Sequence, residues 1–171
     1  KTVSMICSGD AGVYGMAGLI YELAQQYPPI EIQVIPGITA AMSGAAVLGA
    51  PLIHDFAVIS LSDLLTPLDL IMKRVELAAE GDFVLCFYNP ASKKRADYLS
   101  RACQLIMKHR SPETPCGYVR NIGRDGEESC TMTLRELEQA QVDMFTTVFV
   151  GNSQTKLING KLVTPRGYHH V

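Results

Sequence analysis

Residues 8–18, SGDAGVYGMAG, join an apolar run to a helical pattern through a glycine-rich turn, and this order indicates the class of fold. The run before it, TVSMIC at 2–7, is apolar and β-branched, and residues 14–26 after it have helical spacing. A strand, a turn and a helix in this order begin an α/β unit, and the turn presents backbone N–H groups at a helix N-terminus. Its glycines match neither the G-x-G-x-x-G dinucleotide pattern nor a P-loop; they are Gly9, Gly12, Gly15 and Gly18.

Asp10 lies inside this turn, and its carboxylate would repel a phosphate. A single acid suits a ligand that carries a positive charge or hydroxyl groups, such as an amino-acid ammonium or a ribose. From this stretch alone the alternative stays open, namely a tight turn in which Asp10 only caps the helix.

A second turn of the same type follows in VIPGITAAMSGAAVLGAP, residues 34–51. It leads from an apolar run at 30–35 through Pro36-Gly37 into a helix at 38–48 that consists largely of Ala, Gly, Thr and Ser. Small residues allow such a helix to approach a sheet or a ligand closely, and Thr39 lies in its first turn. Both turns follow predicted strands, and ligands collect at the carboxyl ends of strands in open α/β sheets.

The rest of the chain alternates between strand and helix patterns, which predicts an α/β fold with largely parallel strands. Further strands are expected at 56–61, 82–87 and 145–150, and helices at 67–80 and 93–109. The pattern breaks over 50–66, the expected linker between two units. More antiparallel pairing is expected in the second unit, from EESCTMTL at 127–134 and a hairpin at Asn159-Gly160.

Composition bounds the class of protein. The chain has 171 residues, of which 47% are apolar and 19% charged, as in ordinary globular proteins. A net charge of −2 without a basic stripe argues against nucleic acid, and no apolar run has the length of a membrane span. The five cysteines show no zinc or disulfide spacing, which favours reduced thiols in the cytoplasm. We expect no metal, because His169-His170 has no third ligand spaced nearby.

The two glycine-rich stretches and GAPLIHDFAVISLSDLLTP (49–67), in this order and spacing, resemble the tetrapyrrole (corrin/porphyrin) methyltransferase family, which uses S-adenosylmethionine. HDFAVISLSDLLTP, FYNPASKKR and TTVFVGNS are most similar to members that methylate C-17 of a precorrin-3B or cobalt-precorrin-3 macrocycle and contract its ring in cobalamin biosynthesis. The resemblance spans nearly the whole chain.

The resemblance implies two α/β domains with the cofactor in the cleft between them. Family members begin with a strand and a GxGPGD-like loop, which this sequence does not contain. We therefore expect residues 1–52 to be the C-terminal part of a first domain truncated at its N-terminus, and 53–171 to be the linker and second domain. A homodimer is the expected assembly.

The resemblance also assigns site residues. Those expected to bind S-adenosylmethionine are Ser8, Gly9, Asp10, Val13, Tyr14, Thr39, Ala40, Asn89, Asn121, Ile122 and Gly123. Those expected to bind the polycarboxylate tetrapyrrole are Ser62, Lys93, Arg95, Arg120 and Arg124, although a basic run on a helix is also typical of a solvated face. Ring contraction benefits from a proton donor or acceptor, for which the candidates are Asp55, Asp63 and His54. A helix cap at Asp63 and a linker hydrogen bond at His54 are the structural alternatives.

Two other functions stay open at this point. One is another member of the same family that methylates a different ring carbon or acceptor. The other is a fragment without catalytic activity that binds a nucleoside or a partner.

Overall fold

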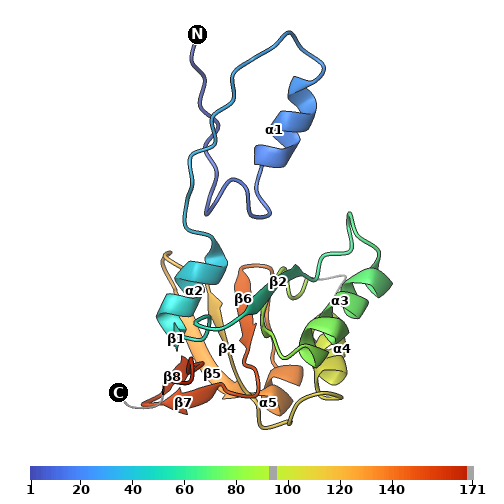
Figure 1. Cartoon of the computed structure of the whole chain (residues 1–171), viewed down its shortest axis with the longest axis vertical. Helices are drawn as coiled ribbons and strands as arrows, with labels where there is room; N and C mark the ends of the chain where they lie inside the picture. The colour runs from blue at the N-terminus through green and yellow to red at the C-terminus, as the bar shows by residue number, and fades with distance from the viewer. Residues whose placement is uncertain (93–95, 169–171) are drawn as a thin grey trace.

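A five-stranded sheet carries most of the fold in this computed structural model, which describes residues 1–92 and 96–168 (Figure 1). Its strand order is β2-β3-β6-β4-β5. β2 is parallel to β3, while β6 is antiparallel to both β3 and β4, and β5 is antiparallel to β4. The carboxyl ends of β2, β3 and β4 therefore lie at the same end of the sheet. The strands are β2 (Phe56–Ser60), β3 (Val84–Tyr88), β4 (Pro115–Arg120), β5 (Glu128–Thr133) and β6 (Thr146–Val150).

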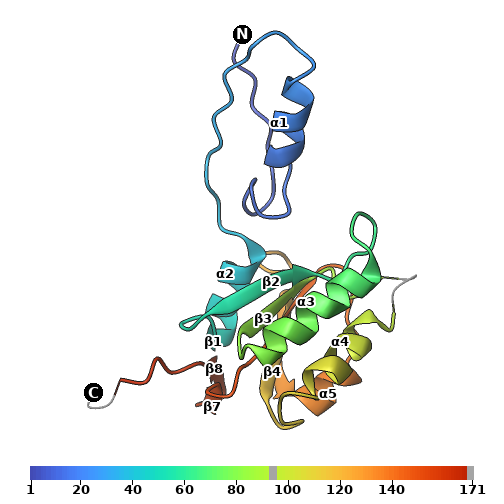
Figure 2. The same ribbon diagram turned by 45° about the vertical axis from the view of Figure 1, so that its right-hand side comes forward.

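Helices cover both faces of this sheet (Figure 2). α2 (Ala40–Leu48) covers one face, and α3 (Leu68–Glu80), α4 (Tyr98–Ile106) and α5 (Leu134–Glu138) cover the other. Side chains alternate along a strand, so β6 sends Phe149 toward α2 and its valines toward the other helices. Every residue of β6 is buried, because both faces of this central strand are covered.

The small residues of α2 allow the helix to pack closely on the sheet, as the sequence predicts. A Cβ atom added at Gly44 would lie 3.0 Å from side-chain atoms of both Ile122 and Phe149. The helix therefore packs with its backbone against the sheet, which fixes the position of its N-terminus relative to the strand ends.

A small three-stranded sheet closes the C-terminal side of α2. β7 (Lys156–Ile158) and β8 (Lys161–Val163) form an antiparallel hairpin, and β1 (Gly49–Ala50) pairs in parallel with β8. Asn159 and Gly160 have φ angles of 49° and 75°, as a two-residue turn between twisted strands requires. The predicted hairpin is thus confirmed.

Residues 1–38 extend away from the sheet, except near Tyr14, whose hydroxyl bonds β2, and they contain one helix, α1 (Ala17–Ala24) (Figures 1 and 2). The strands expected at 2–7 and 30–35 are wrong for this structure, since neither segment is paired in a ladder. An apolar run becomes a strand only where a neighbour accepts and donates its backbone hydrogen bonds. α1 is also shorter than the expected 14–26.

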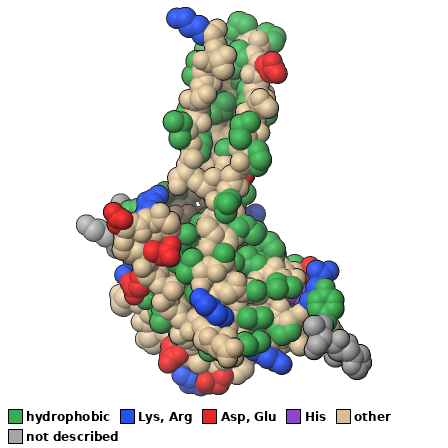
Figure 3. Space-filling view, turned by 90° about the vertical axis from the view of Figure 1, so that its left-hand side faces the viewer, with side chains coloured by type: hydrophobic (Ala, Val, Ile, Leu, Met, Phe, Trp, Pro, Cys, Tyr) green, Lys and Arg blue, Asp and Glu red, His purple; other side chains and the backbone are tan. Residues whose placement is uncertain are grey.

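Apolar side chains on this N-terminal segment are exposed. Val3 and Ile6 are 87% and 93% exposed, and α1 buries none of its residues. Figure 3 shows hydrophobic side chains spread along the whole segment, with few charges between them. Apolar surface of this extent is unusual for a folded monomer.

Three elements were not predicted, namely the two-residue strand β1, β4 and α5. β4 contains Pro115 and Gly117, which dilute its strand pattern. α5 begins with a capping box in which Thr133 accepts from the N–H of Glu136 and the Glu136 carboxylate accepts from the N–H of Thr133.

In the described ranges, 1–92 and 96–168, no helix has the length and apolar character needed to cross a bilayer.

We expect Gly44→Val to lower the free energy of unfolding by about 1–3 kcal/mol, because the new side chain would overlap Phe149 and Ile122. Ala46→Val, on the exposed side of the same helix, should cost less than about 0.7 kcal/mol. Urea midpoints of the two variants measure the difference. Equal midpoints would show that α2 does not pack closely on the sheet.

Candidate functional site

The two glycine-rich turns meet backbone to backbone. A Cβ atom at Gly37 would lie 2.0 Å from the carbonyl oxygen of Gly9 and 3.3 Å from the Cα of Asp10. No side chain fits in that space, so Gly37 is required for the first turn to contact the second. The contact brings residues 8–12 to the N-terminus of α2.

Asp10 joins the two turns through its carboxylate. Oδ1 accepts the N–H of Gly12 at 2.8 Å, and Oδ2 accepts the N–H of Gly37 at 2.8 Å. The hydrogen bond from Gly37, followed by that from Gly12, holds the pKa of Asp10 below its ordinary value. Asp10 is therefore a clasp between the turns, and its oxygens already have partners in the chain.

The N-terminus of α2 is held by a side chain from β3. Thr39, the residue before the helix, makes no capping bond to its own helix. Instead, the Tyr88 hydroxyl accepts the N–H of Ala41 at 2.6 Å and shares a hydrogen bond of 2.5 Å with Thr39 Oγ1. Partial burial raises the pKa of Tyr88, so the hydroxyl stays protonated at neutral pH.

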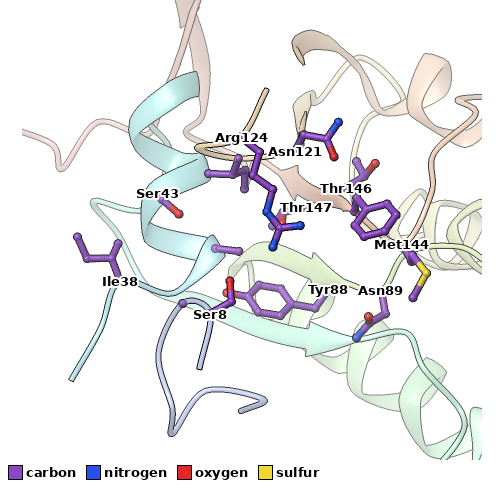
Figure 4. Close-up of a pocket in the computed structure, with 14 residues that line it drawn as sticks. Ser8, Ile38, Ser43, Tyr88, Asn89, Asn121, Arg124, Met144, Thr146 and Thr147 are labelled. Carbon is purple, nitrogen blue, oxygen red and sulfur yellow. The ribbon is translucent and has the colours of Figure 1, made fainter. Parts of the chain in front are cut away.

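A cleft of about 270 Å³ opens between the turns and the carboxyl ends of β3 and β4 (Figure 4). Its lining combines hydroxyl and amide groups with apolar side chains and one arginine. The lining residues are Ser8, Gly9, Ile38, Ala40, Ser43, Tyr88, Asn89, Asn121, Ile122, Arg124, Met144, Phe145, Thr146 and Thr147.

Two residues that line this cleft have left-handed backbone conformations. Asn89 and Asn121, which follow β3 and β4 directly, have φ angles of 51° and 52°. Asparagine tolerates this region better than most residues, and such conformations cluster at functional sites. The Asn89 side-chain amide donates to Ser60 Oγ at 3.0 Å, which ties the ends of β2 and β3 together.

The two predicted arginines differ in their surroundings. Arg124 points into the middle of the cleft, toward Tyr88 and Thr147 (Figure 4). Arg120 makes ion pairs with Glu128 at 3.1 Å and Asp143 at 3.4 Å, so its charge is neutralised within the fold. Only Arg124 of this pair offers a cation to a ligand in the cleft.

Six of the residues expected to bind the cofactor line the cleft, namely Ser8, Gly9, Ala40, Asn89, Asn121 and Ile122. The other five do not line it and make hydrogen bonds within the fold. Gly123 donates its N–H to Glu127, and the Val13 N–H bonds the Asp10 carbonyl, while Asp10, Tyr14 and Thr39 bond the surrounding backbone and side chains.

Sequence reasoning missed several lining residues. Tyr88 stands in the quoted motif FYNP directly before the predicted Asn89, and that adjacency was the available signal. The segment Met144–Thr147 enters the cleft because β6 is antiparallel to β3, so its amino end lies beside the carboxyl end of β3. The order of strands in the sheet decides this, and the sequence pattern does not contain it.

The predicted acids are divided between the two ends of β2. Asp63 follows the carboxyl end of the strand and accepts a hydrogen bond of 2.7 Å from the Tyr98 hydroxyl. Asp55 precedes the amino end, where its N–H donates to His54 Nδ1 at 3.0 Å. Asp55 and Ser60 are five residue steps apart along the strand, or about 16 Å. The structure therefore does not bring His54 and Asp55 to the cleft.

Ser62, the remaining predicted substrate-binding residue that the structure describes, does not line the cleft. Ser62 donates its N–H to Ser60 Oγ at 3.3 Å. Lys93 and Arg95, like His169 and His170, lie outside the described residues. Within the described ranges, no three His, Cys, Asp or Glu side chains gather to hold a metal ion.

Comparison with known proteins finds relatives that are similar over nearly the whole chain. The family model described as Tetrapyrrole (Corrin/Porphyrin) Methylases matches residues 1–138. A "Probable cobalt-factor III C(17)-methyltransferase" of Salmonella typhimurium (strain LT2) is 50% identical over 167 residues, which are 97% of this chain and 69% of the relative.

Solved structures show the same fold. The methyltransferase CobJ superimposes with a TM-score of 0.84 and 38% identity, over 92% of this chain and 67% of its own. A uroporphyrin-III C-methyl transferase from Thermus thermophilus, complexed with S-adenyl homocysteine, has a TM-score of 0.60 and 20% identity, over 84% of this chain and 62% of its own.

The Asp10 clasp should depend on pH. Because the carboxylate accepts both hydrogen bonds and its pKa is lowered, the clasp is complete above the ordinary pKa of an aspartate and is lost as the pH falls through the lowered value. Hydrogen-exchange protection of the Gly12 and Gly37 amides should therefore hold from about pH 6 to 4 and fall below that.

Asp10→Asn should show reduced protection of these amides already at neutral pH, since its amide NH₂ cannot accept the second bond. The control is Asp125→Asn, on the exposed loop after Arg124, which should leave both amides as protected as in the wild type. Equal protection in Asp10→Asn and wild type would contradict the clasp.

Proposed function

Since this chain belongs to the tetrapyrrole (corrin/porphyrin) methylase family, we propose that it transfers a methyl group from S-adenosylmethionine to C-17 of a precorrin-3B or cobalt-precorrin-3 macrocycle in cobalamin biosynthesis. The identity of 50% to a cobalt-factor III C(17)-methyltransferase supports this choice within the family. The observation that carries it is the cleft in which both glycine-rich turns meet the strand ends.

The lining of the cleft fits S-adenosylmethionine. Side-chain amides and hydroxyls from Asn89, Asn121 and Ser43 suit the ribose and the edge of an adenine ring. Apolar side chains beside them, Ile122 and Phe145, suit the faces of that ring. Ser8 and Gly9 form the proposed contact with the methionine end, on a turn that Asp10 holds in place.

When bound, S-adenosylmethionine supplies a methyl group that is already activated by its sulfonium. The chain therefore contributes mainly position, because holding two reactants at near-attack distance removes much of the barrier. The backbone contact between the two turns and the hydrogen bond from Ala41 to the Tyr88 hydroxyl would fix the cofactor site, and rigid contacts of this kind give precise positions.

Arg124 is the proposed partner of a substrate carboxylate. The substrate is a polycarboxylate, and the guanidinium group points into the cleft (Figure 4). No acidic side chain among the described residues forms an ion pair with Arg124, whereas Arg120 has two such partners. A guanidinium and a carboxylate form strong paired hydrogen bonds.

Asp63 is the proposed proton-handling group for ring contraction. It lies at the same end of the sheet as the cleft, and the Tyr98 hydroxyl orients its carboxylate. His54 and Asp55 are the other two candidates that the sequence suggests for proton transfer, but they lie at the opposite end of β2. Asp63 is therefore the residue to test first.

We propose a homodimer in the cytoplasm. The exposed apolar side chains of residues 1–38 give the chain a surface that association would cover. The five cysteines are free, as in proteins of reducing compartments. Sedimentation velocity tests the assembly, and a clean monomer at high concentration would contradict it.

The test of the activity is incubation of the chain with S-adenosylmethionine and a precorrin-3-type tetrapyrrole. Mass spectrometry should show a product heavier by one methyl group, and the absorption spectrum shows whether the macrocycle has contracted. Methylation of a different acceptor, with none on the precorrin, would contradict the proposed substrate and retain the cofactor.

Arg124→Ala should raise the KM for the tetrapyrrole about tenfold, as loss of one charged hydrogen-bonded pair does, and leave the unfolding midpoint unchanged. Arg120→Ala should act in the opposite sense, with a lower unfolding midpoint and a KM near the wild-type value, because its partners lie within the fold. The reverse pattern would mean that Arg120, and not Arg124, binds the substrate.

Asp63→Asn should slow ring contraction more than methyl transfer, because the carboxylate that moves the proton is lost and the cofactor turns stay intact. Asp55→Asn is the matched control at the far end of β2, and both of its steps should run at wild-type rates. Wild-type rates of both steps in Asp63→Asn would show that this acid has a structural role.

A further inference from the structure

Two tyrosine rings meet beside the cleft and connect its parts. Tyr14, from the first glycine-rich turn, and Tyr88, from the end of β3, have ring centroids 5.3 Å apart at an interplanar angle of 50°. Such tilted pairs are favourable beyond the apolar area they bury. The pair connects the N-terminal segment, residues 1–38, to the sheet.

The Tyr14 hydroxyl substitutes for a neighbouring strand at the edge of the sheet. β2 is an edge strand, so some of its backbone groups lack a ladder partner. Tyr14 Oη donates to the carbonyl of Val58 at 3.2 Å and accepts the N–H of Ser60 at 3.1 Å. One hydroxyl thus makes the donor and acceptor contacts that a strand residue would make.

The backbone at Tyr14 is held in an uncommon conformation. Its φ of 51° lies in the left-handed region, which is an outlier for a bulky aromatic residue. The residue is 59% exposed, so burial of the ring does not explain that conformation. In this conformation the Tyr14 hydroxyl reaches the backbone of β2. Strained backbone of this kind is found mainly at functional sites.

Tyr88 makes the corresponding connection to the second turn. Its hydroxyl bonds Thr39 Oγ1 and accepts the N–H of Ala41 in the first turn of α2, as described above. Each tyrosine therefore fixes one glycine-rich turn to the sheet, and the two rings contact each other between the turns.

We propose that Tyr14 and Tyr88 are positioning residues that set the affinity for the S-adenosyl cofactor by fixing the two turns to the strand ends. This rests on the proposed function, and it changes the role expected for Tyr14 from direct contact to support. The Tyr14 hydroxyl has both of its hydrogen bonds on β2 and does not reach for the ligand.

The first test needs no ligand. In Tyr14→Phe the Ser60 amide should exchange with solvent about tenfold faster, and in Tyr88→Phe the Ala41 amide should do so, because each loses its acceptor. The matched control is Tyr118→Phe, which loses one hydroxyl contact to Glu128 on β5 and should change neither amide. Unchanged exchange at Ser60 and Ala41 would overturn the proposal.

The second test measures the cofactor. Tyr14→Phe and Tyr88→Phe should each weaken binding of S-adenosylhomocysteine about five- to tenfold and raise the KM for S-adenosylmethionine by a similar factor. The kcat at saturating cofactor should stay within about twofold, because the variants loosen the site without removing a reacting group. Tyr118→Phe should keep the wild-type affinity.

The outcomes separate this proposal from the proposed function. Wild-type affinity in both phenylalanine variants would overturn the positioning role and leave the methyltransferase intact. A loss as large in Tyr118→Phe would also overturn it, since the cause would then be general stability. No binding by the wild-type chain would contradict the proposed function, while the exchange rates of Ser60 and Ala41 would still decide whether the tyrosines fix the turns.

Discussion

The backbone contact between Gly37 and Gly9 is the constraint on which the site depends. A side chain at Gly37 would collide with the Gly9 carbonyl, so the two turns meet only because that position is glycine. The Asp10 carboxylate then bonds the amides of both turns, and the second turn leads directly into α2. One contact between two short turns therefore places residues 8–12, the N-terminus of α2 and the adjoining strand ends around one cleft.

The sheet determines what else reaches that cleft. β2, β3 and β4 run in one direction, and the antiparallel β6 lies between β3 and β4. Loops after β3 and β4 consequently meet the segment before β6, which brings together Asn89, Asn121 and Thr146 from distant parts of the sequence. Such an arrangement suits a reaction in which position contributes more than proton transfer, as expected for transfer of an activated methyl group.

Sequence patterns predicted the elements that are buried on both sides or clearly amphipathic. The strands expected at 56–61, 82–87 and 145–150 are confirmed as β2, β3 and β6, and the helix expected at 67–80 is α3. The runs at 2–7 and 30–35 have the same apolar character but pair with no strand among the described residues, and hydropathy alone contains no information about neighbours. The cleft was predicted in part, because the two glycine-rich turns have a local sequence signal even though the segments before them are not strands.

The parts that sequence reasoning missed depend on long-range geometry. Tyr88 bonds Thr39 across 49 positions, and nothing in FYNP indicates that contact. Arg120 and Arg124 are alike in sequence, and only the positions of Glu128 and Asp143 make one of them structural. Asp55 and Asp63 stand eight positions apart in one motif, yet an intervening strand places them at opposite ends of the sheet.

Binding of the S-adenosyl group in the cleft at the two turns can be measured by NMR titration of the ¹⁵N-labelled chain with S-adenosylhomocysteine. If the cleft is the cofactor site, the backbone amides of Gly9, Asn89, Asn121 and Thr147, all of which line it, shift saturably. Absence of saturable shifts would exclude this cofactor site. So would shifts that gather instead around the small hollow beside Val47, Cys130 and Lys161, on the far side of α2 from its N-terminus.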